Sequence, residues 1–246
     1  MTEKKAAVIL AAGKGKRMKS DLPKVLHGIK GKPMIRHLME TITDTDWDRI
    51  IIVVGHQGDL VIEELRDFNV EFVWQKEQLG TGHAVLMARP NLIDFKGTVL
   101  VAAGDVPFLS LDSISGLIKV HHKNGAAATC LSVSFDNPRG YGRIIRRPGT
   151  DILLDIVEDK DASEDIKKIR EVNSGTFCFD CRSLFDSLEK IGNENAQREY
   201  YLTDTIKILQ AAGKPCAVYE ISDPLEVTGV NSVEQLLALE REFKKD

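Results

Sequence analysis

Two short apolar runs, at residues 49–54 and 98–103, constrain the fold of this chain more than any other feature. Apart from the first residue of each run, they contain only Ile, Val, Leu and Ala, a composition typical of strands that are covered on both faces. Strand-like and helix-like segments alternate around them: strands are predicted at 5–11, 49–54, 70–74 and 98–103, and helices at 33–42, 58–66, 81–89 and 111–124. This alternation predicts an α/β fold with a mainly parallel sheet.

The second half of the chain changes character. Strand-like segments with short connections follow one another at 126–135, 141–147, 152–157 and 172–179, which predicts hairpins or an antiparallel edge beside the parallel sheet. Helices at 182–191 and 203–212, a strand at 217–221 and a helix at 233–244 complete the prediction, and Ser232 and Gln235 could form a capping box on the last helix. Since no Pro- or Ser-rich linker divides the chain, we predict one domain over 1–246 with two lobes, mainly 1–110 and 126–231.

Charge and apolar patterning exclude several classes of protein. A net charge of −4 over 246 residues argues against a general nucleic-acid coat. The longest apolar runs, such as 6–12, are far shorter than the ~18 residues that a membrane helix needs. The run at 6–12 also ends at a Gly- and Lys-rich turn, which fits a buried first strand better than a signal peptide. We therefore predict a cytoplasmic protein that binds neither nucleic acid nor a membrane.

Two short motifs invite a metal interpretation that their context does not support. Cys178 and Cys181 form a lone CxxC without the second pair that a structural zinc site needs, so we predict reduced cysteines. Asp44, Asp46 and Asp48 form two overlapping DxD sequences between a predicted helix and the start of a strand. Ligands in open α/β sheets bind beyond the other ends of the strands, so we interpret these aspartates as a solvated turn.

A Gly-rich, cationic turn follows the first predicted strand. Gly13 and Gly15 allow a tight turn with exposed N–H groups that can surround a phosphate. A dinucleotide fingerprint fails because Met18 stands where a third glycine is needed, and no Walker A run is present. Arg17 and Lys24 nevertheless favour a polyphosphate ligand over an ordinary Gly-rich turn with solvated lysines.

Residues 10–27, LAAGKGKRMKSDLPKVLH, resemble the signature of the sugar-nucleotide pyrophosphorylases, and most closely that of the N-acetylglucosamine-1-phosphate uridyltransferases. Further blocks agree in order over nearly the whole chain; they lie at 75–84, 104–107, 140–144, 156–162, 171–175, 199–204 and 229–231. The resemblance implies a Rossmann-like, GT-A-like nucleotidyltransferase fold with a smaller antiparallel sugar-binding lobe. We derive no chemical role for the block at 199–204.

The resemblance also implies a reaction. UTP and N-acetylglucosamine 1-phosphate would give UDP-N-acetylglucosamine, a precursor for peptidoglycan and cell-wall synthesis, and pyrophosphate, by in-line attack on the α-phosphorus. Such transfers depend mainly on positioning and charge neutralisation. Arg17 and Lys24 are the implied catalytic residues. Asp105 and Asn231 would hold Mg²⁺, which prefers a few hard oxygen ligands together with waters and phosphate oxygens.

Substrate contacts carry over from the family in the same way. Uracil would be recognised by Ala11, Ala12, Gln75, Gly80 and Thr81, whereas Gln75 taken alone would more often be a solvated glutamine. The sugar would be recognised by Gly142, Glu158 and Asn173. The complete implied substrate set is Leu10, Ala11, Ala12, Gly13, Lys24, Gln75, Gly80, Thr81, Ala103, Gly104, Asp105, Gly142, Glu158, Asn173 and Asn231. Ala103 departs from the pattern, because some family members carry a tyrosine there.

Two alternatives stay open at this stage. One is a related sugar-1-phosphate nucleotidyltransferase with a different base or sugar, and the other is a catalytically silent nucleotide-sugar sensor on the same fold. The intact set of Arg17, Lys24, Asp105 and Asn231 argues against silence. Bifunctional relatives continue past the last predicted helix into a β-helix that carries acetyl transfer and trimer contacts, whereas this sequence of 246 residues has no room for one. We therefore predict the uridyltransferase activity alone, without that domain, in a monomer or weak dimer.

Overall fold

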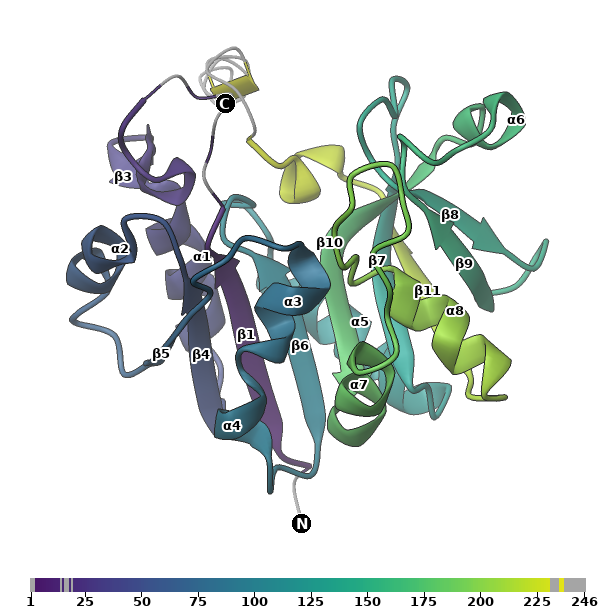
Figure 1. Ribbon diagram of the computed structural model, residues 1–246, viewed down its shortest axis with the longest axis horizontal. Helices are drawn as coiled ribbons and strands as arrows, with labels where there is room; N and C mark the ends of the chain where they lie inside the picture. Colours follow the sequence, from purple (N-terminus) through teal and green to yellow (C-terminus); the bar gives the residue numbers. More distant parts are fainter. Residues whose placement is uncertain (1–2, 14, 16–17, 19, 231–234, 237–246) are drawn as a thin grey trace.

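The computed structural model of the protein describes residues 3–13, 15, 18, 20–230 and 235–236. A mixed sheet with the strand order β11-β7-β10-β6-β1-β4-β5 forms its centre (Figure 1). β1 (Lys5–Ala11) lies between β4 (Arg49–Val54) and β6 (Thr98–Ala103) and is parallel to both, and β4 continues in parallel to β5 (Glu71–Trp74). The two apolar runs are therefore central parallel strands, as predicted.

The other half of the same sheet is largely antiparallel. β10 (Glu171–Asp180) pairs antiparallel with β6 on one side and with β7 (Ala128–Ser134) on the other, and β11 (Cys216–Ile221) lies parallel to β7. β8 (Arg143–Arg146) and β9 (Leu153–Val157) form a hairpin that leaves the main path of the sheet. The predicted mainly parallel α/β fold with an antiparallel part is confirmed.

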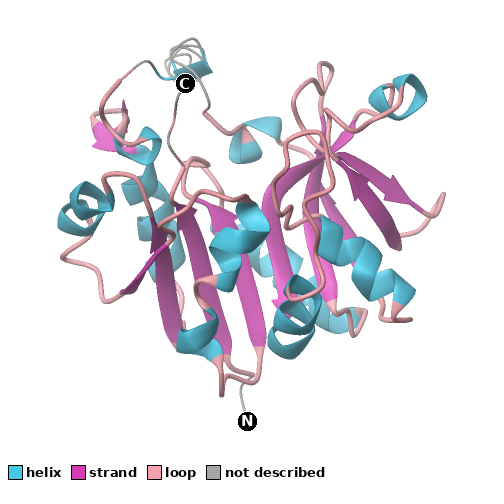
Figure 2. Cartoon of the chain, in the orientation of Figure 1, coloured by secondary structure: helices cyan, strands magenta, loops and turns pink. Residues whose placement is uncertain are grey.

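Helices cover both faces of the sheet (Figure 2). One face packs against α3 (Thr81–Leu86), α4 (Arg89–Leu92), α7 (Cys181–Leu188) and α8 (Asp204–Ala211). The opposite face packs against α1 (Met34–Thr43), α2 (Gly58–Glu64) and α5 (Leu111–Lys123). Alternate residues of β1 point to opposite faces, so that Ala6 and Val8 join the first core while Ala7 and Ile9 join the second.

The sequence-based element boundaries differ from the structure at a few places. The helix predicted at 81–89 is two helices, because Pro90 has no N–H and starts the first turn of α4. The helix predicted at 233–244 and Ser232 of its capping box lie outside the described residues, except for 235–236. The short elements were not predicted: η2 (Lys24–Leu26), β2 (Gly28–Ile29), β3 (Lys32–Pro33), α6 (Glu164–Lys167) and η3 (Pro224–Val227).

A bulge in β10 brings the antiparallel half close to the parallel half. The pairing of β10 with β7 shifts between Asn173, which faces Ser132, and Phe177, which faces Cys130. Gly175 has φ +81° inside this bulge, and a Cβ there would lie 4.0 Å from the Cβ of Ala103 at the end of β6. Bulges of this kind bend a strand and re-aim its side chains, here toward the carboxyl end of β6.

The motifs set aside in the sequence lie where chemistry is not expected. Asp44 ends α1, and the Asp48 carboxylate accepts a hydrogen bond from the Lys5 backbone N–H at 2.8 Å, at the amino ends of β1 and β4. Cys178 and Cys181 are both buried free thiols, and burial raises the pKa of both. None of the helices in the described part of the chain is long and apolar enough to cross a membrane.

Candidate active site

The carboxyl ends of β1 and β6 approach each other closely. Leu10 faces Ala103 in the parallel register, and the Gly104 backbone N–H donates to the Leu10 carbonyl at 2.9 Å. A Cβ on Gly104 would lie 3.1 Å from that carbonyl oxygen, so a larger residue would push the two turns apart. The predicted residues Leu10, Ala103 and Gly104 are thus brought together at one edge of the sheet.

A glycine after β4 supports the phosphate turn from the other side. A Cβ on Gly55 would lie 2.7 Å from the carbonyl oxygen of Ala12. The side chains of Ala11 and Ala12 are buried, whereas Gly13 is exposed and has open space where a Cβ would stand. These alanines can therefore meet a ligand only through backbone atoms. Sequence reasoning missed Gly55, although a glycine directly after a central parallel strand was a usable signal.

The predicted catalytic lysine and the predicted metal ligand form an ion pair. Lys24 begins η2, Asp105 follows β6, and the Lys24 ammonium donates to Oδ2 of Asp105 although the two residues are 81 positions apart. Both side chains are largely buried. Gly15 has φ +57° and a Cβ there would lie 2.9 Å from the Cβ of Lys24, so the glycine turn folds against the lysine.

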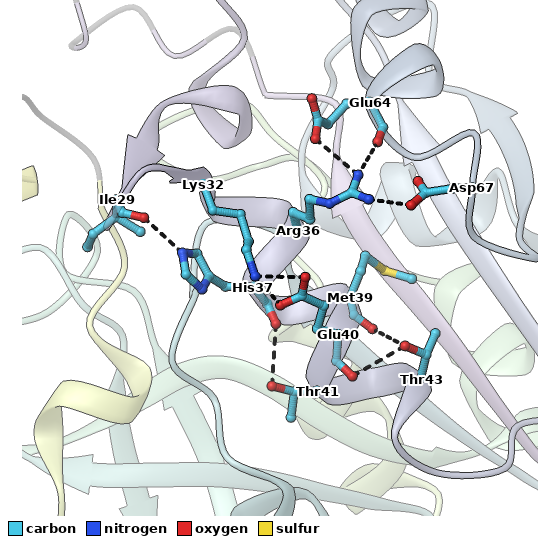
Figure 3. Close-up of polar contacts among 10 residues, drawn as sticks. All are labelled: Ile29, Lys32, Arg36, His37, Met39, Glu40, Thr41, Thr43, Glu64 and Asp67. Carbon is cyan, nitrogen blue, oxygen red and sulfur yellow. Dashed lines mark hydrogen bonds and ion pairs between the residues drawn. The ribbon is translucent and has the colours of Figure 1, made fainter.

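α1 holds the segment that follows Lys24 at two residues, Ile29 and Lys32 (Figure 3). His37 on α1 donates through Nε2 to the Ile29 carbonyl at 2.8 Å, and Lys32 pairs with Glu40 at 2.6 Å. The helix is itself tied to the end of α2, because Arg36 donates to the carboxylates of Glu64 and Asp67. A cationic turn held at several points loses little further freedom when it takes a ligand.

The chain returns to Asp105 just before residue 231. The Val230 backbone N–H donates to the Asp105 carbonyl at 3.2 Å. The Tyr141 hydroxyl bonds to the backbone of Gly229, and burial raises the pKa of Tyr141, with the negative charge of Asp105 adding to the effect. Asn231, the second predicted metal ligand, and Arg17, the other predicted catalytic residue, lie outside the described residues.

The residues predicted to bind the base form a connected unit after β5. Gln75 is only 3% exposed, so the interpretation of a solvated glutamine is wrong. Its side-chain nitrogen donates to the Gly80 carbonyl and lies 3.0 Å from Nδ1 of His83. A carbonyl can only accept, so this contact fixes the amide nitrogen on that side and the amide oxygen on the other. Thr81 begins α3 directly after Gly80.

The residues predicted to bind the sugar meet beside the β8–β9 hairpin. The Asn173 backbone N–H donates to the Gly142 carbonyl at 2.8 Å, and a Cβ on Gly142 would lie 3.5 Å from Oε1 of Glu158. The side-chain oxygen of Asn173 accepts from the Gly175 N–H at 2.8 Å inside the bulge. Burial raises the pKa of Glu158, and the neighbouring Asp204, Asp161 and Asp159 raise it further.

The block at 199–204, whose role the sequence did not reveal, connects these two groups of residues; we call it the strap. Tyr200 donates to the Leu79 carbonyl and accepts from the Gly82 N–H, each at 2.8 Å. The Leu202 N–H donates to Oγ1 of Thr81 at 3.0 Å. The next residue, Thr203, donates its hydroxyl to Oε1 of Glu158 at 2.9 Å. The strap therefore touches the predicted base loop and the predicted sugar carboxylate through consecutive residues.

Comparison with known proteins gives both a family match and relatives. The family model for the MobA-like NTP transferase domain matches residues 7–205. The chain is 46% identical over 237 residues to the bifunctional protein GlmU of Heliobacterium modesticaldum, covering 96% of this chain and 51% of that protein. It is 47% identical over 233 residues to the GlmU of Geobacter metallireducens, covering 94% and 48%. The chain thus spans about half the length of the curated relatives it matches.

Solved structures show the same fold at low sequence identity. A UDP-glucose pyrophosphorylase complexed with UDP-glucose is 19% identical with a TM-score of 0.77, covering 98% of this chain and 99% of that one. The inositol-1-phosphate CTP transferase from T. maritima is 16% identical with a TM-score of 0.73, covering 98% of both chains. At these identities the likeness concerns the fold alone.

Proposed function

The chain belongs to the family of MobA-like NTP transferase domains, and from that premise we propose that it transfers the uridylyl group of UTP to N-acetylglucosamine 1-phosphate. The products are UDP-N-acetylglucosamine and pyrophosphate. The relatives at 46–47% identity are proteins named GlmU, which supports this sugar and this base over others. The observation that carries the proposal is the Lys24–Asp105 ion pair at the edge of the sheet, beside a glycine turn.

A magnesium ion suits the residues at this edge. The Asp105 carboxylate already faces a positive charge, the Lys24 ammonium, so it is placed to hold a cation. Among the residues that the structure describes, no group of three or more His, Cys, Asp or Glu side chains could hold a metal ion. We propose that Asp105 and Asn231 hold Mg²⁺ together with phosphate oxygens and waters, as this ion prefers. When bound, it neutralises charge on the phosphates.

Lys24 can interact with both Asp105 and a phosphate. Its ammonium bonds to Asp105, and a triphosphate offers it oxygens with greater negative charge. We assign Lys24 to the phosphates at the reacting centre, and Arg17 with the backbone of residues 13–16 to the β- and γ-phosphates. A sugar-phosphate oxygen attacks the α-phosphorus, the α–β bridging bond breaks, and pyrophosphate leaves in line. Positioning and charge neutralisation carry most of the catalysis in such transfers.

Base selection follows from the orientation of Gln75. Its amide nitrogen is occupied by Gly80 and His83, which leaves the amide oxygen to accept a hydrogen bond from a base. Uracil carries an N–H at position 3 and cytosine does not, so this oxygen discriminates between UTP and CTP. The backbones of Ala11 and Ala12, with Gly80 and Thr81, complete the proposed base contacts.

Sugar recognition falls to Glu158, Asn173 and the backbone at Gly142. The half-buried carboxylate of Glu158 can accept hydrogen bonds from sugar hydroxyls, and the side-chain nitrogen of Asn173 can donate because its oxygen is occupied inside the bulge. Asn173 and Gly142 are joined by a backbone hydrogen bond, so the two act as one surface.

Pyrophosphate release from UTP, CTP and dTTP, each with several sugar 1-phosphates, tests the proposal. We expect the fastest release with UTP and N-acetylglucosamine 1-phosphate, little with CTP, and intermediate release with dTTP because thymine also carries the N–H at position 3. Faster release with another pair would assign the chain to a related transferase of different specificity. No release from any pair would refute a catalytic function and favour a nucleotide-sugar sensor.

A further inference from the structure

Thr203 stands at the start of α8 but does not cap the helix. A threonine at this position commonly accepts a hydrogen bond from a backbone N–H of the first turn. Thr203 makes no such bond, and its hydroxyl instead donates to Oε1 of Glu158 at 2.9 Å. The residue is only 3% exposed, so this hydroxyl is not available to bulk water. The Thr203 side chain therefore does not cap α8 and instead contacts Glu158, the carboxylate proposed to bind the sugar.

Glu158 needs such a partner because its surroundings disfavour its charge. The residue is half-buried, and the nearby Asp159, Asp161 and Asp204 are also acidic. The Thr203 hydroxyl is the contact that opposes these effects and favours the ionised form. Within the described part of the chain, Oε2 of Glu158 has no hydrogen-bond partner, so one carboxylate oxygen is held by Thr203 while the other is open to a ligand.

The position of Thr203 depends in turn on the base loop. Leu202, its neighbour, is 3% exposed and donates its backbone N–H to Oγ1 of Thr81. Two residues after Thr203, the Thr205 hydroxyl donates to the Leu202 carbonyl at 2.6 Å and closes the turn. The peptide that carries Thr203 is therefore fixed between the base loop and the first turn of α8.

We propose that Thr203 is a positioning residue for the sugar phosphate, holding the Glu158 carboxylate so that its free oxygen faces the sugar hydroxyls. This inference rests on the proposed function and extends it, because Thr203 touches no reacting atom. Since the strap also bonds to Thr81, the geometry of the sugar subsite is set partly by the base loop. The effect is one of substrate affinity and not of the chemical step.

Steady-state kinetics of Thr203→Val and Thr203→Ser test the inference. Valine keeps the shape and removes the hydroxyl, and we expect the KM for N-acetylglucosamine 1-phosphate to rise about tenfold, the usual effect of one hydrogen bond to a charged group. The KM for UTP and kcat should stay within about twofold. Serine keeps the hydroxyl and should restore a nearly normal KM.

Thr129→Val is the matched control. Thr129 is also fully buried and its hydroxyl bonds to a side chain, Nδ1 of His121, at 2.9 Å. It lies on β7 in register with Cys178 of β10, which is three residues along that strand from Gly175. This variant should lose stability but keep both KM values.

An equal rise of both KM values in Thr203→Val, an unchanged KM for the sugar phosphate, or a failure of Thr203→Ser to restore it would overturn the inference.

A double-mutant cycle separates this inference from the proposed function. Thr203→Val should shift the urea unfolding equilibrium several-fold less in a Glu158→Leu background, because the contact it removes is then absent. Additive effects would overturn the inference whatever the protein catalyses. Wild-type protein that turns over no nucleotide and sugar-phosphate pair would instead refute the proposed function, while the cycle would still report on the contact between Thr203 and Glu158.

Discussion

The parallel and antiparallel halves of one sheet position their proposed site residues by different means. In the parallel half, the residues stand in turns directly after strands: Gly13 after β1, Gly55 after β4, Gln75 after β5 and Asp105 after β6. In the antiparallel half, Gly142 precedes a strand, Glu158 follows one and Asn173 lies within one. Parallel strands place all their carboxyl ends at the same edge, whereas antiparallel strands alternate.

The two halves are also held together by different kinds of contact. The turns of the parallel half are joined by short backbone bonds and glycine contacts, such as Gly104 to Leu10 and Gly55 to Ala12. The antiparallel half uses buried polar side chains, such as Thr203 on Glu158 and Arg143 on Asp159. We therefore expect the loss of Asp105 in the parallel half to stop the reaction, and changes in the supporting contacts to produce graded losses of affinity or stability.

The largest expected effect is that of Asp105→Ala in the parallel half. Alanine removes the carboxylate proposed to hold positive charge at the phosphates, and kcat should fall about a thousandfold. Urea unfolding should show a folded protein. Asp112→Ala, at an exposed position in the first turn of α5, is the matched control and should turn over normally. Near-normal Mg²⁺-dependent turnover of Asp105→Ala would show that the metal assignment is wrong.

Arg143→Ala should give the largest loss of stability in the antiparallel half. Arg143 is 2% exposed, donates to the Tyr141 carbonyl and pairs with Asp159 at 3.0 Å, so it joins the turn at Gly142 to the turn after Glu158. We expect the free energy of unfolding in urea to fall by about 3 kcal/mol, because the change removes a buried charge partner and leaves a cavity.

Arg146→Ala on the same strand is the control for Arg143. Arg146 is 31% exposed and pairs with Glu171 and Glu220, each at 2.9 Å. Its removal should cost less than that of Arg143, about 1 kcal/mol, because Arg146 itself is in contact with water although its partner Glu171 is largely buried. Equal losses in the two variants would show that burial does not distinguish these two contacts.

Gly80→Ala should disturb the base loop through the strap. Gly80 has φ +118°, and a Cβ there would lie 2.5 Å from the Tyr200 carbonyl oxygen. We expect a loss of about 2 kcal/mol in unfolding free energy together with a raised KM for UTP. Gly213→Ala separates the two causes, since Gly213 has φ +70° but open space around a Cβ. Gly213→Ala should lower the free energy of unfolding by about 1 kcal/mol and leave the KM for UTP unchanged. Equal losses of unfolding free energy in the two variants would mean that the strap shifts to accommodate the Cβ at residue 80 at little energetic cost.

The smallest expected effect is a pH dependence of product binding. Burial raises the pKa of Glu158, so its carboxyl group stays protonated to a higher pH than an ordinary glutamate. Affinity for UDP-N-acetylglucosamine should rise as pH rises through that pKa, by about fivefold, because an ionised acceptor makes stronger hydrogen bonds than a neutral one. Isothermal titration calorimetry measures this directly, because the diphosphate ligand does not titrate there.

Two variants bracket this pH dependence. Glu158→Gln cannot ionise and should bind with the same affinity at every pH. Thr203→Val should move the midpoint upward, because the Thr203 hydroxyl favours the ionised carboxylate. A pH dependence that persists in Glu158→Gln would assign the titration to another group.

The fold and the proximity of the proposed site residues in the parallel half could be predicted from the sequence, and the reason is local. Apolar runs identify central strands, and the turns that follow them contain the proposed ligand-binding residues, so Gly13 and Asp105 could be located from their neighbours along the chain. The contact between Lys24 and Asp105 needed the parallel register of β1 and β6, but both residues had been singled out beforehand.

The antiparallel half was less predictable because its supporting contacts join distant residues. Thr203 and Glu158 are 45 positions apart, and Leu202 and Thr81 are 121 apart. Much of the strap acts through backbone atoms of Tyr200, which any residue would supply, so residue type carries no signal there. The bulge at Gly175 is also set by the pairing of β10 with β7 and not by a local motif.

One ³¹P NMR experiment tests the central proposal most directly. The purified chain is mixed with UTP, N-acetylglucosamine 1-phosphate and Mg²⁺, and the phosphorus signals are followed over time. We predict that the signals of both substrates decline together while those of UDP-N-acetylglucosamine and free pyrophosphate grow in equal amounts. Unchanged substrate signals, or inorganic phosphate in place of pyrophosphate, would contradict the account, because the bond between the α- and β-phosphates would not then be the one that breaks.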